Sequence, residues 1–348
     1  MDAPEVIARR DGQVGRLVLN RPKALHALTL GMCELMIQAL LAWRDDPAVA
    51  LVLIDHAGER GFCAGGDIRM LAESGAADGA AARAFFFSEY RLNHLLFTYP
   101  KRVAVVMGGG VGISMPARFR VATERTTYAM PETGIGLFPD VGGGWFLPRL
   151  PGKTGLWLAL TGARIKTADC LALGIATDCV ASDGVEALKA AICADPAAIE
   201  TLLAEAEADP GQAPIGVHRD ESDRLFGADS VEAIMGALAA DGGEWAQAQL
   251  ATLRAKSPQT VKVAFRQLAI GAGLTDFADN MAMEYRLGAR IVRRHDFIEG
   301  VRAVIVDKDN NPAWNPPGLE GVTAAVLDEL FAPLPADQEW SPLPQAVA

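Results

Sequence analysis

Long apolar runs and an excess of basic residues are both missing from this 348-residue sequence. A membrane-spanning helix needs about 20 consecutive apolar residues, whereas apolar runs here, such as those at 50–54 and 103–107, have only the length of buried strands. Lysine and arginine number 32 against 43 aspartates and glutamates, which argues against the basic surface of a nucleic-acid-binding protein. Because 50% of the residues are hydrophobic, the chain is also too apolar to be disordered. We expect a soluble globular protein with two domains, or one large core with an appendage.

Cysteine and histidine are scarce and dispersed, with five of each. No Cys-x-x-Cys pair and no histidine cluster occurs, which argues against a disulfide framework and against a bound metal. The first residues carry neither a basic segment followed by an apolar run nor an arginine- and serine-rich amphipathic segment. We therefore expect neither a secretory signal nor a transit peptide, and a reducing, cytoplasmic location.

Strands and helices alternate in the first half of the chain. Asp11-Gly12 between two short apolar runs predicts a hairpin over 6–20, and a helical apolar period begins after Thr29, a suitable N-cap. The same patterns predict strands at 50–54, 103–106, 120–123 and 127–130, and helices at 80–97 and 154–160. This alternation up to residue 182 favours an α/β fold with ligand sites at the carboxyl ends of strands.

Beyond Gly184 the sequence becomes helical in character. Segments rich in alanine and glutamate at 185–207, 230–238 and 244–253 have amphipathic periods, and the next run typical of a strand is 303–306. The segment from Pro333 onward is rich in proline, and we expect it to fray.

Three glycine-rich loops follow predicted strands, at 61–67, 108–112 and 134–144. Without a Cβ atom, glycine lets backbone N–H groups approach a ligand closely. Two such loops that face each other could present two donors to one oxygen, which is the arrangement of an oxyanion hole. Taken singly, each loop is equally consistent with a tight turn. The loop at 108–112 lacks the full dinucleotide-binding fingerprint, so a dinucleotide cofactor is not expected.

Three acidic residues lie beside apolar sequence. Glu132 and Asp140 are separated by glycine and apolar residues, where burial would raise their pKa values and suit acid–base or nucleophilic chemistry. Glu89 closely follows three phenylalanines in a predicted helix. Each has a plain structural alternative: Glu132 as a solvated loop acid, Asp140 as a helix N-cap, and Glu89 as an exposed helix position.

Together, these segments resemble the crotonase (enoyl-CoA hydratase/isomerase) superfamily, and more closely its 3-hydroxyisobutyryl-CoA hydrolase branch. The most specific part is the long Pro-Glu-Thr motif at 131–144. The other segments that carry the resemblance are 20–25, 62–69, 107–114, 283–287 and the region from His295 to Asn311.

The resemblance implies a crotonase-like spiral core of β-β-α units over 1–190 and an α-helical region over 191–348 that covers the active site. It implies an acyl-CoA thioester whose carbonyl oxygen is held by the backbone N–H groups of Gly66 and Gly109. By motif position, the substrate-binding residues are Glu89, Lys23, Ala24, Leu25, Ala64, Asp67 and Ile68. CoA enters only as part of the substrate, so no separate cofactor is implied. The superfamily often forms trimers, so the resemblance leaves a homo-oligomer open, and the sequence identifies no interface.

Hydratases of this superfamily resemble one another in having two catalytic glutamates. Here the first of those positions is Gly112 and only the second, Glu132, is acidic. The hydrolase branch instead pairs the position of Glu132 with a later acid, which here is Asp140. The resemblance therefore favours hydrolysis of 3-hydroxyisobutyryl-CoA, a thioesterase reaction of valine (branched-chain amino acid) degradation, with Glu132 and Asp140 as catalytic residues.

Two alternative functions remain. The first is an enoyl-CoA hydratase or isomerase. The second is a catalytically impaired acyl-CoA-binding protein on the same fold, because the segment before Gly108 is shorter than in the hydrolase branch.

Overall fold

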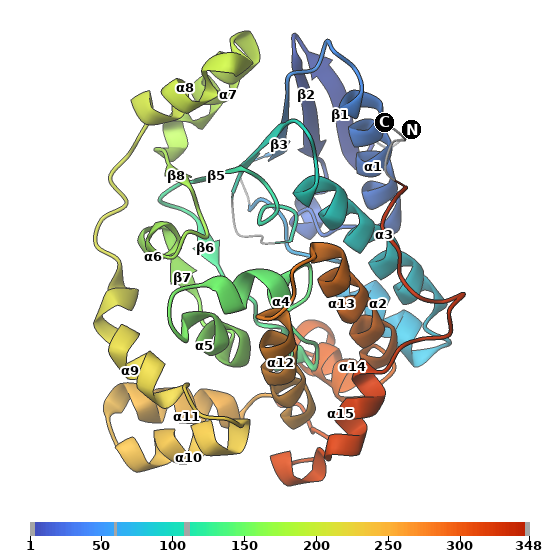
Figure 1. The fold of residues 1–348 in the computed structure, drawn as a ribbon, viewed down its shortest axis with the longest axis vertical. Coiled ribbons are helices and arrows are strands. Elements are labelled where there is room, and N and C mark those ends of the chain that lie inside the picture. Colours follow the sequence, from blue (N-terminus) through green and yellow to red (C-terminus); the bar gives the residue numbers. More distant parts are fainter. Residues whose placement is uncertain (1–3, 59–60, 108–111, 345–348) are drawn as a thin grey trace.

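A six-stranded sheet forms the centre of the computed structural model, which describes residues 4–58, 61–107 and 112–344 (Figure 1). The predicted hairpin is present as β1 (Val6–Asp11) and β2 (Val14–Leu19), which pair antiparallel. The remaining strands pair parallel in the order β2-β3-β4-β5-β8, and they are β3 (Leu51–His56), β4 (Arg102–Val106), β5 (Phe119–Ala122) and β8 (Asp178–Cys179). A separate pair joins β6 (Thr127–Tyr128) to β7 (Ile165–Lys166).

Side chains of the sheet alternate between two cores on its opposite faces. On β3, Val52 and Ile54 belong to a large core that includes α1 (Leu30–Arg44) and α3 (Ala80–Phe97). Leu51 and Leu53 belong to a smaller core with α7 (Val185–Ala194) and α8 (Ile199–Glu205). The pleat of a strand produces this period of two. Because β3 is buried on both faces, its first four residues, 51–54, form a continuous apolar run and do not alternate with polar residues.

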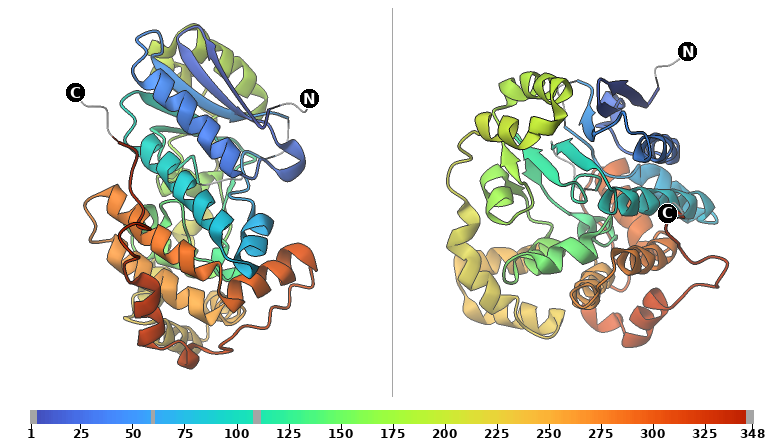
Figure 2. Two further views of the ribbon diagram at one scale, coloured as in Figure 1. Left: turned by 90° about the vertical axis from the view of Figure 1, so that its right-hand side faces the viewer. Right: turned by 45° about the horizontal axis from the view of Figure 1, so that its top comes forward.

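The chain between β8 and the C-terminus is mostly helical; α7 and α8 lie at the top of the molecule in Figure 1, beside the sheet, and the later helices form its lower part. Figure 2 shows α3 running between α1 and α13, and it contacts both. The helices of this part beyond α8 are α9 (Arg219–Leu225), α10 (Val231–Asp241), α11 (Glu244–Arg254), α12 (Pro258–Gly271), α13 (Phe277–Ile291), α14 (His295–Val301) and α15 (Ala324–Phe331). The shorter helices among the strands are α2 (Ile68–Ala76), α4 (Gly143–Phe146), α5 (Thr154–Thr161) and α6 (Thr167–Ala172). In the part of the chain that the structure describes, every helix is too short or too polar to cross a bilayer.

The strand predicted at 303–306 is wrong. These residues form a π-helical turn (Arg302–Val306) that continues α14. Arg302 pairs with Glu299 in the preceding turn and with Asp307 after it, which holds the backbone in a helical course. Val306 is 50% exposed, so the apolar run lies partly at the surface and is not a buried strand.

The fraying predicted beyond Pro333 is also wrong for residues 333–344, which we call the C-terminal strap. Trp340 is 5% exposed, and its Nε1 donates to the carbonyl of Phe87 on α3 at 3.2 Å. Glu339 pairs with Arg286 on α13 at 2.9 Å. The strap therefore lies across two helices that are far apart in sequence.

Candidate active site

Two loops leave neighbouring parallel strands at the same edge of the sheet. One follows β3 and contains Gly66, and the other follows β4 and contains Gly112. The carboxyl ends of adjacent parallel strands lie side by side, which is where ligands bind in open α/β sheets. Gly109, the second predicted oxyanion-hole residue, lies outside the described residues.

The backbone around Gly66 leaves one N–H without a partner. The Leu28 N–H donates to the Gly65 carbonyl at 2.8 Å, and the Asp67 N–H donates to the Leu28 carbonyl at 3.0 Å. The Gly66 N–H between them finds no acceptor among the residues that the structure describes. A Cβ atom at this position would lie 2.7 Å from Cε1 of Phe85, so only glycine fits. The result is an unpaired donor in close surroundings, as an oxyanion hole requires.

The predicted CoA-binding residues come from two segments that the backbone ties together. The first is the 3₁₀ turn Pro22–Ala24 with the following Leu25, and the second is the loop 64–68. The Ala64 N–H donates to the Leu25 carbonyl at 3.0 Å. This contact brings together Lys23, Ala24, Leu25, Ala64, Asp67 and Ile68.

Two of these residues differ in what they can offer a ligand. The Asp67 carboxylate already pairs with Arg21 at 3.3 Å and accepts from the Met70 N–H as the N-cap of α2. It therefore shapes the loop. Lys23 is exposed and makes no ion pair with another described residue, which leaves its ammonium group available to an anionic ligand.

Glu132 begins a 3₁₀ turn (Glu132–Ile135) directly after Pro131. Its Oε2 atom is buried and has no hydrogen-bond partner among the described residues. Burial raises the pKa of Glu132 well above its usual range, and the nearby Asp140 raises it further, while Lys256 opposes both effects. A carboxylate with so little solvation is well suited to act as a base or a nucleophile.

Asp140 lies against α3. The Tyr90 hydroxyl donates to Asp140 Oδ2 at 3.1 Å. Burial raises the pKa of Asp140 to about 6, even though the Tyr90 hydrogen bond acts to lower it. Glu89, the residue before Tyr90, is 1% exposed, and its pKa is raised first by burial and then by Asp140. Glu89 and Asp140 are thus buried, and Glu132 is half-buried, with one buried carboxylate oxygen and its pKa raised by Asp140. Glu89 is therefore not an exposed helix position, and Asp140 is not the N-cap of α4, which is Gly142.

A fourth acid, Glu284 on α13, did not emerge as a site residue from the sequence. Its buried carboxylate accepts from the N–H groups of Gly142 at 2.8 Å and Gly144 at 2.9 Å. The side-chain amides of Asn280 and Gln267 also donate to it, at 2.9 and 3.2 Å. Glu284 could have been found from the sequence by its position on the apolar stripe of α13. A carboxylate that lies in the core needs buried hydrogen-bond donors around it.

The position of the missing hydratase glutamate is closed by packing. Gly112 is buried, and a Cβ atom built on it would lie 3.3 Å from Cγ2 of Val141, the residue after Asp140. A contact of that length is tighter than ordinary van der Waals contact, so a glutamate side chain would displace Val141. The structure therefore has a carboxylate at Glu132, while Val141 packs against the glycine at the other position.

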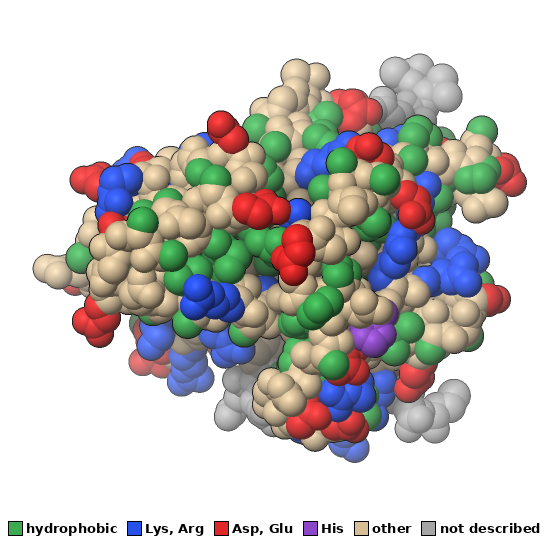
Figure 3. Space-filling model, turned by 90° about the horizontal axis from the view of Figure 1, so that it is seen from below, with side chains coloured by type: hydrophobic (Ala, Val, Ile, Leu, Met, Phe, Trp, Pro, Cys, Tyr) green, Lys and Arg blue, Asp and Glu red, His purple; other side chains and the backbone are tan. Residues whose placement is uncertain are grey.

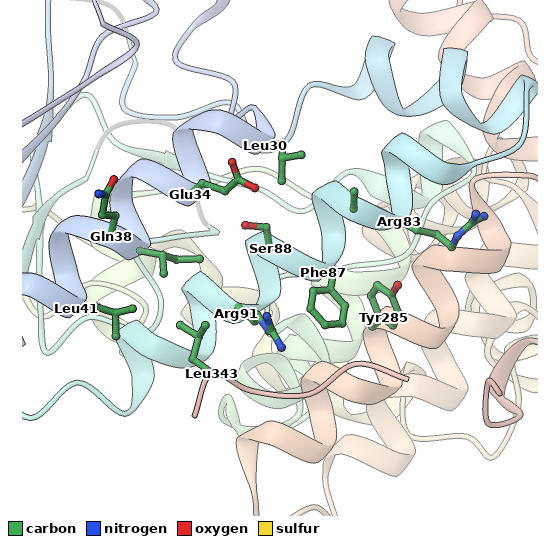
Figure 4. Close-up of a pocket in the computed structure, with 12 residues that line it drawn as sticks. Leu30, Glu34, Gln38, Leu41, Arg83, Phe87, Ser88, Arg91, Tyr285 and Leu343 are labelled. Carbon is green, nitrogen blue, oxygen red and sulfur yellow. The ribbon is translucent and has the colours of Figure 1, made fainter. Parts of the chain in front are cut away.

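The surface shows no comparable concentration of charge on the face seen in Figure 3, where acidic and basic side chains are interspersed. A groove of about 570 Å³ lies between α1 and α3 on the outside of the molecule (Figure 4). Glu34, Ser88 and Arg91 line it, and the interior acids do not. The acids of the candidate site therefore lie on the interior side of α3, away from the outer groove.

Comparison with known proteins agrees with the fold and the motifs. The sequence profile of the enoyl-CoA hydratase/isomerase family matches residues 14–331, and the chain belongs to this family. A mitochondrial 3-hydroxyisobutyryl-CoA hydrolase from Danio rerio is 45% identical over 344 residues, which cover 95% of this chain and 90% of that protein. The Homo sapiens protein of the same name is 42% identical over 346 residues, covering 95% and 89%.

Solved structures confirm the predicted crotonase-like α/β fold with a helical C-terminal region. A carnitinyl-CoA dehydratase from Mycobacterium thermoresistibile superposes with a TM-score of 0.93 at 39% identity, covering 97% of this chain and 99% of that one. An enoyl-CoA hydratase from Rhodobacter sphaeroides gives 0.88 at 37% identity, covering 97% and 100%.

The cytoplasmic location expected from the sequence is contradicted by these relatives, because the Danio rerio and Homo sapiens hydrolases are both named as mitochondrial. Part of that expectation rested on unpaired cysteines, and all five are free in the structure. Free cysteines indicate a reducing environment, which is not unique to the cytoplasm.

Proposed function

We propose that this chain hydrolyses 3-hydroxyisobutyryl-CoA to 3-hydroxyisobutyrate and free CoA. The names of the Danio rerio and Homo sapiens relatives support this activity. The structural observation that carries it is the pairing of Glu132 with Asp140 beside a closed hydratase position at Gly112. Addition of water to a double bond would lack half of its acid–base pair in such a site.

The thioester carbonyl would be polarised by two backbone donors, the N–H groups of Gly66 and Gly109. The unpaired N–H of Gly66 supports the first of these roles. An oxyanion-hole donor typically contributes about 3 kcal/mol of transition-state stabilisation. Because the fixed amide needs no reorganisation when charge develops on the oxygen, its contribution belongs to the transition state and not to substrate binding.

Glu132 would attack the polarised carbonyl carbon, or take a proton from a water molecule that attacks it. By either route the C–S bond breaks and the thiolate of CoA leaves. In the first route, water then hydrolyses the mixed anhydride and restores the Glu132 carboxylate. Asp140 would bind the 3-hydroxyl of the substrate or assist proton transfer to the thiolate, and its pKa of about 6 suits exchange of a proton near neutral pH.

Substrate binding would use Glu89 in the acyl pocket and the segments with Lys23, Ala24, Leu25, Ala64, Asp67 and Ile68 for CoA. The exposed ammonium group of Lys23 would supply positive charge to the anionic CoA part of the substrate, although the chain as a whole is acidic. The reaction would serve valine degradation, and the protein would act as a homo-oligomer, as the superfamily often does.

The decisive experiment replaces Glu132 with Gln and follows thiol release from 3-hydroxyisobutyryl-CoA. Turnover should fall at least 1,000-fold, in the range seen when a catalytic nucleophile or base is removed, while affinity for the CoA ester changes less than about threefold because the amide keeps the shape. Glu34→Gln makes the same chemical change at an exposed position of the outer groove and should be silent. Near-normal turnover by the Glu132 variant would refute the assignment.

A second candidate, an enoyl-CoA hydratase, has support from the name of the similar Rhodobacter sphaeroides structure. Hydration of crotonyl-CoA by the wild-type protein, with no thiol released from the 3-hydroxyacyl ester, would establish it instead. Binding of either ester without any reaction would point to the catalytically impaired acyl-CoA-binding protein.

A further inference from the structure

One buried polar side chain in the interior of the molecule has no partner. Asn93 on α3 is 0% exposed, and both its Oδ1 and its Nδ2 atoms are buried without a hydrogen-bond partner among the described residues. Buried amides are almost always hydrogen-bonded, because an unmade hydrogen bond in the interior costs free energy. A side chain that carries this cost on both of its polar atoms points to a ligand that is not present.

The position of Asn93 on α3 places it next to the acids of the site. It lies four residues after Glu89 and three after Tyr90, and residues at these spacings share one face of a helix. Tyr90 bonds to Asp140, and Glu89 is close enough to Asp140 for the two carboxyl groups to interact. Asn93 thus continues the polar face of α3 by one turn.

The segment that carries Asp140 follows α3 past Asn93. Asp140 meets Tyr90 at one end, and at the other end Trp145 and Phe146 pack against Phe97, with ring centroids 5.8 and 6.2 Å apart. Asn93 lies between Tyr90 and Phe97 on the helix. Asn93 therefore lies on the stretch of α3 that the Asp140 segment follows, and it is buried like Glu89.

We propose that Asn93 determines specificity by binding the 3-hydroxyl group of the acyl chain. This assignment rests on the proposed hydrolase function. A hydroxyl group both accepts and donates a hydrogen bond. The amide Nδ2–H of Asn93 donates to the hydroxyl oxygen, and the hydroxyl hydrogen is donated to a carboxylate of the same helix face or to Asp140. An acyl chain that lacks the hydroxyl leaves Asn93 unpaired.

The test is a comparison of three thioesters in Asn93→Leu and Asn93→Ala. 3-Hydroxyisobutyryl-CoA carries the hydroxyl and the methyl branch, 3-hydroxypropionyl-CoA keeps only the hydroxyl, and isobutyryl-CoA keeps only the methyl branch. We expect kcat/KM for both hydroxy esters to fall about 10- to 100-fold, and that for isobutyryl-CoA to change less than about twofold, because only the hydroxy esters lose a bond. The ratio of two esters within one preparation is independent of how much of that preparation is folded.

Ser88→Ala on the same helix is the matched control. Ser88 points into the outer groove in Figure 4, and its removal should change none of the three rates. Equal losses on all three esters, or no loss on any, in the Asn93 variants would overturn the assignment of the hydroxyl to Asn93. A wild-type protein that releases no thiol from any ester would overturn the proposed function as well. A melting temperature in Asn93→Leu equal to or above that of the wild type supports the proposal. Removal of an amide whose hydrogen bonds stabilise the fold would instead lower the melting temperature.

Discussion

The carboxyl groups of Glu89 and Asp140 are buried, and Glu132 has one buried carboxylate oxygen. Burial is the largest cause of the raised pKa of each, and the charge of Asp140 adds to the rise at Glu89 and at Glu132. Because each ionised group disfavours ionisation of its neighbours, the acids titrate together and not singly. Glu132 has to be ionised to attack or to accept a proton, so activity should be lost as pH falls through the raised pKa values.

Replacing Asp140 with Asn tests this coupling. In the wild type, kcat/KM should decline on the acid side with a midpoint above the ordinary range of glutamate, because the pKa of Glu132 is raised. The substitution removes a negative charge that raises the pKa of Glu132, so the midpoint should move to lower pH. The measurement is thiol release as a function of pH at low substrate concentration, which reports the free enzyme.

A midpoint that stays in place or moves to higher pH in that variant would contradict the electrostatic link between the two acids. The result is independent of how far the variant lowers the maximum rate, because only the shape of the profile is compared.

At the scale of elements, α13 holds the segment that follows Asp140. The Glu284 carboxylate receives the backbone N–H groups of Gly142 and Gly144, and Gln267 donates both to that carboxylate and to the Pro139 carbonyl at 2.7 Å. The backbone turns sharply here, with φ at +95° for Gly142. Contacts on both sides of Asp140 thus fix its position relative to α3.

Glu284→Gln should loosen this segment. Gln keeps one oxygen acceptor but places an NH₂ group against a backbone N–H, so we expect a loss of stability of about 2 kcal/mol. A displacement of Asp140 by about 1 Å would lower kcat by about 100-fold. Thermal unfolding and thiol release measure the two effects separately. Asp279→Asn, the same change at an exposed position of α13, should alter stability by less than about 0.5 kcal/mol; equal effects of the two substitutions would rule out the anchoring role.

The sequence predicted helices and strands best where a clear apolar period coincided with a residue typical of a cap or a turn at the end of the element. α1 begins after its Thr29 cap, and β1 and β2 flank the turn at Asp11-Gly12, as the sequence indicates. The helical segment predicted at 185–207 is broken at Asp195-Pro196 into α7 and α8. The apolar run 303–306 has no strand period, and its helical form depends on ion pairs of Arg302 with residues in adjoining turns.

At the scale of the whole molecule, the C-terminal strap connects the last residues described to the middle of the chain. Arg91 on α3 donates to the Ser341 carbonyl at 2.8 Å, and Arg290 on α13 donates to the Pro333 carbonyl at 3.0 Å. Trp340 packs edge-on against His94 with the ring centroids 5.9 Å apart. Since α3 carries Glu89, Tyr90 and Asn93, the strap supports the helix that lines the site.

Trp340→Ala should destabilise the protein by about 3 kcal/mol, as loss of a buried tryptophan generally does. Trp314, which is more exposed and donates one hydrogen bond to the Ala255 carbonyl, provides the matched control. Its replacement by Ala should cost about 1 kcal/mol. Unfolding in urea measures both, and a strap that merely covers the surface would show no difference between them.

Local motifs and periods in the sequence predicted an α/β fold, and the resemblance to the crotonase superfamily predicted its particular type. Glu89, Glu132, Asp140 and Gly66 could be proposed as site residues from the sequence, because glycine-rich turns and acids beside apolar residues are local signals. Only the tertiary structure brought in Glu284, Tyr90 and Asn93 and closed the space beside Gly112 with Val141. These depend on which side chains meet across segments up to about 140 residues apart, and a linear pattern holds no record of such contacts. The C-terminal strap shows the same limit. Its four prolines predict a frayed segment, and only the tertiary structure shows the helices against which it packs.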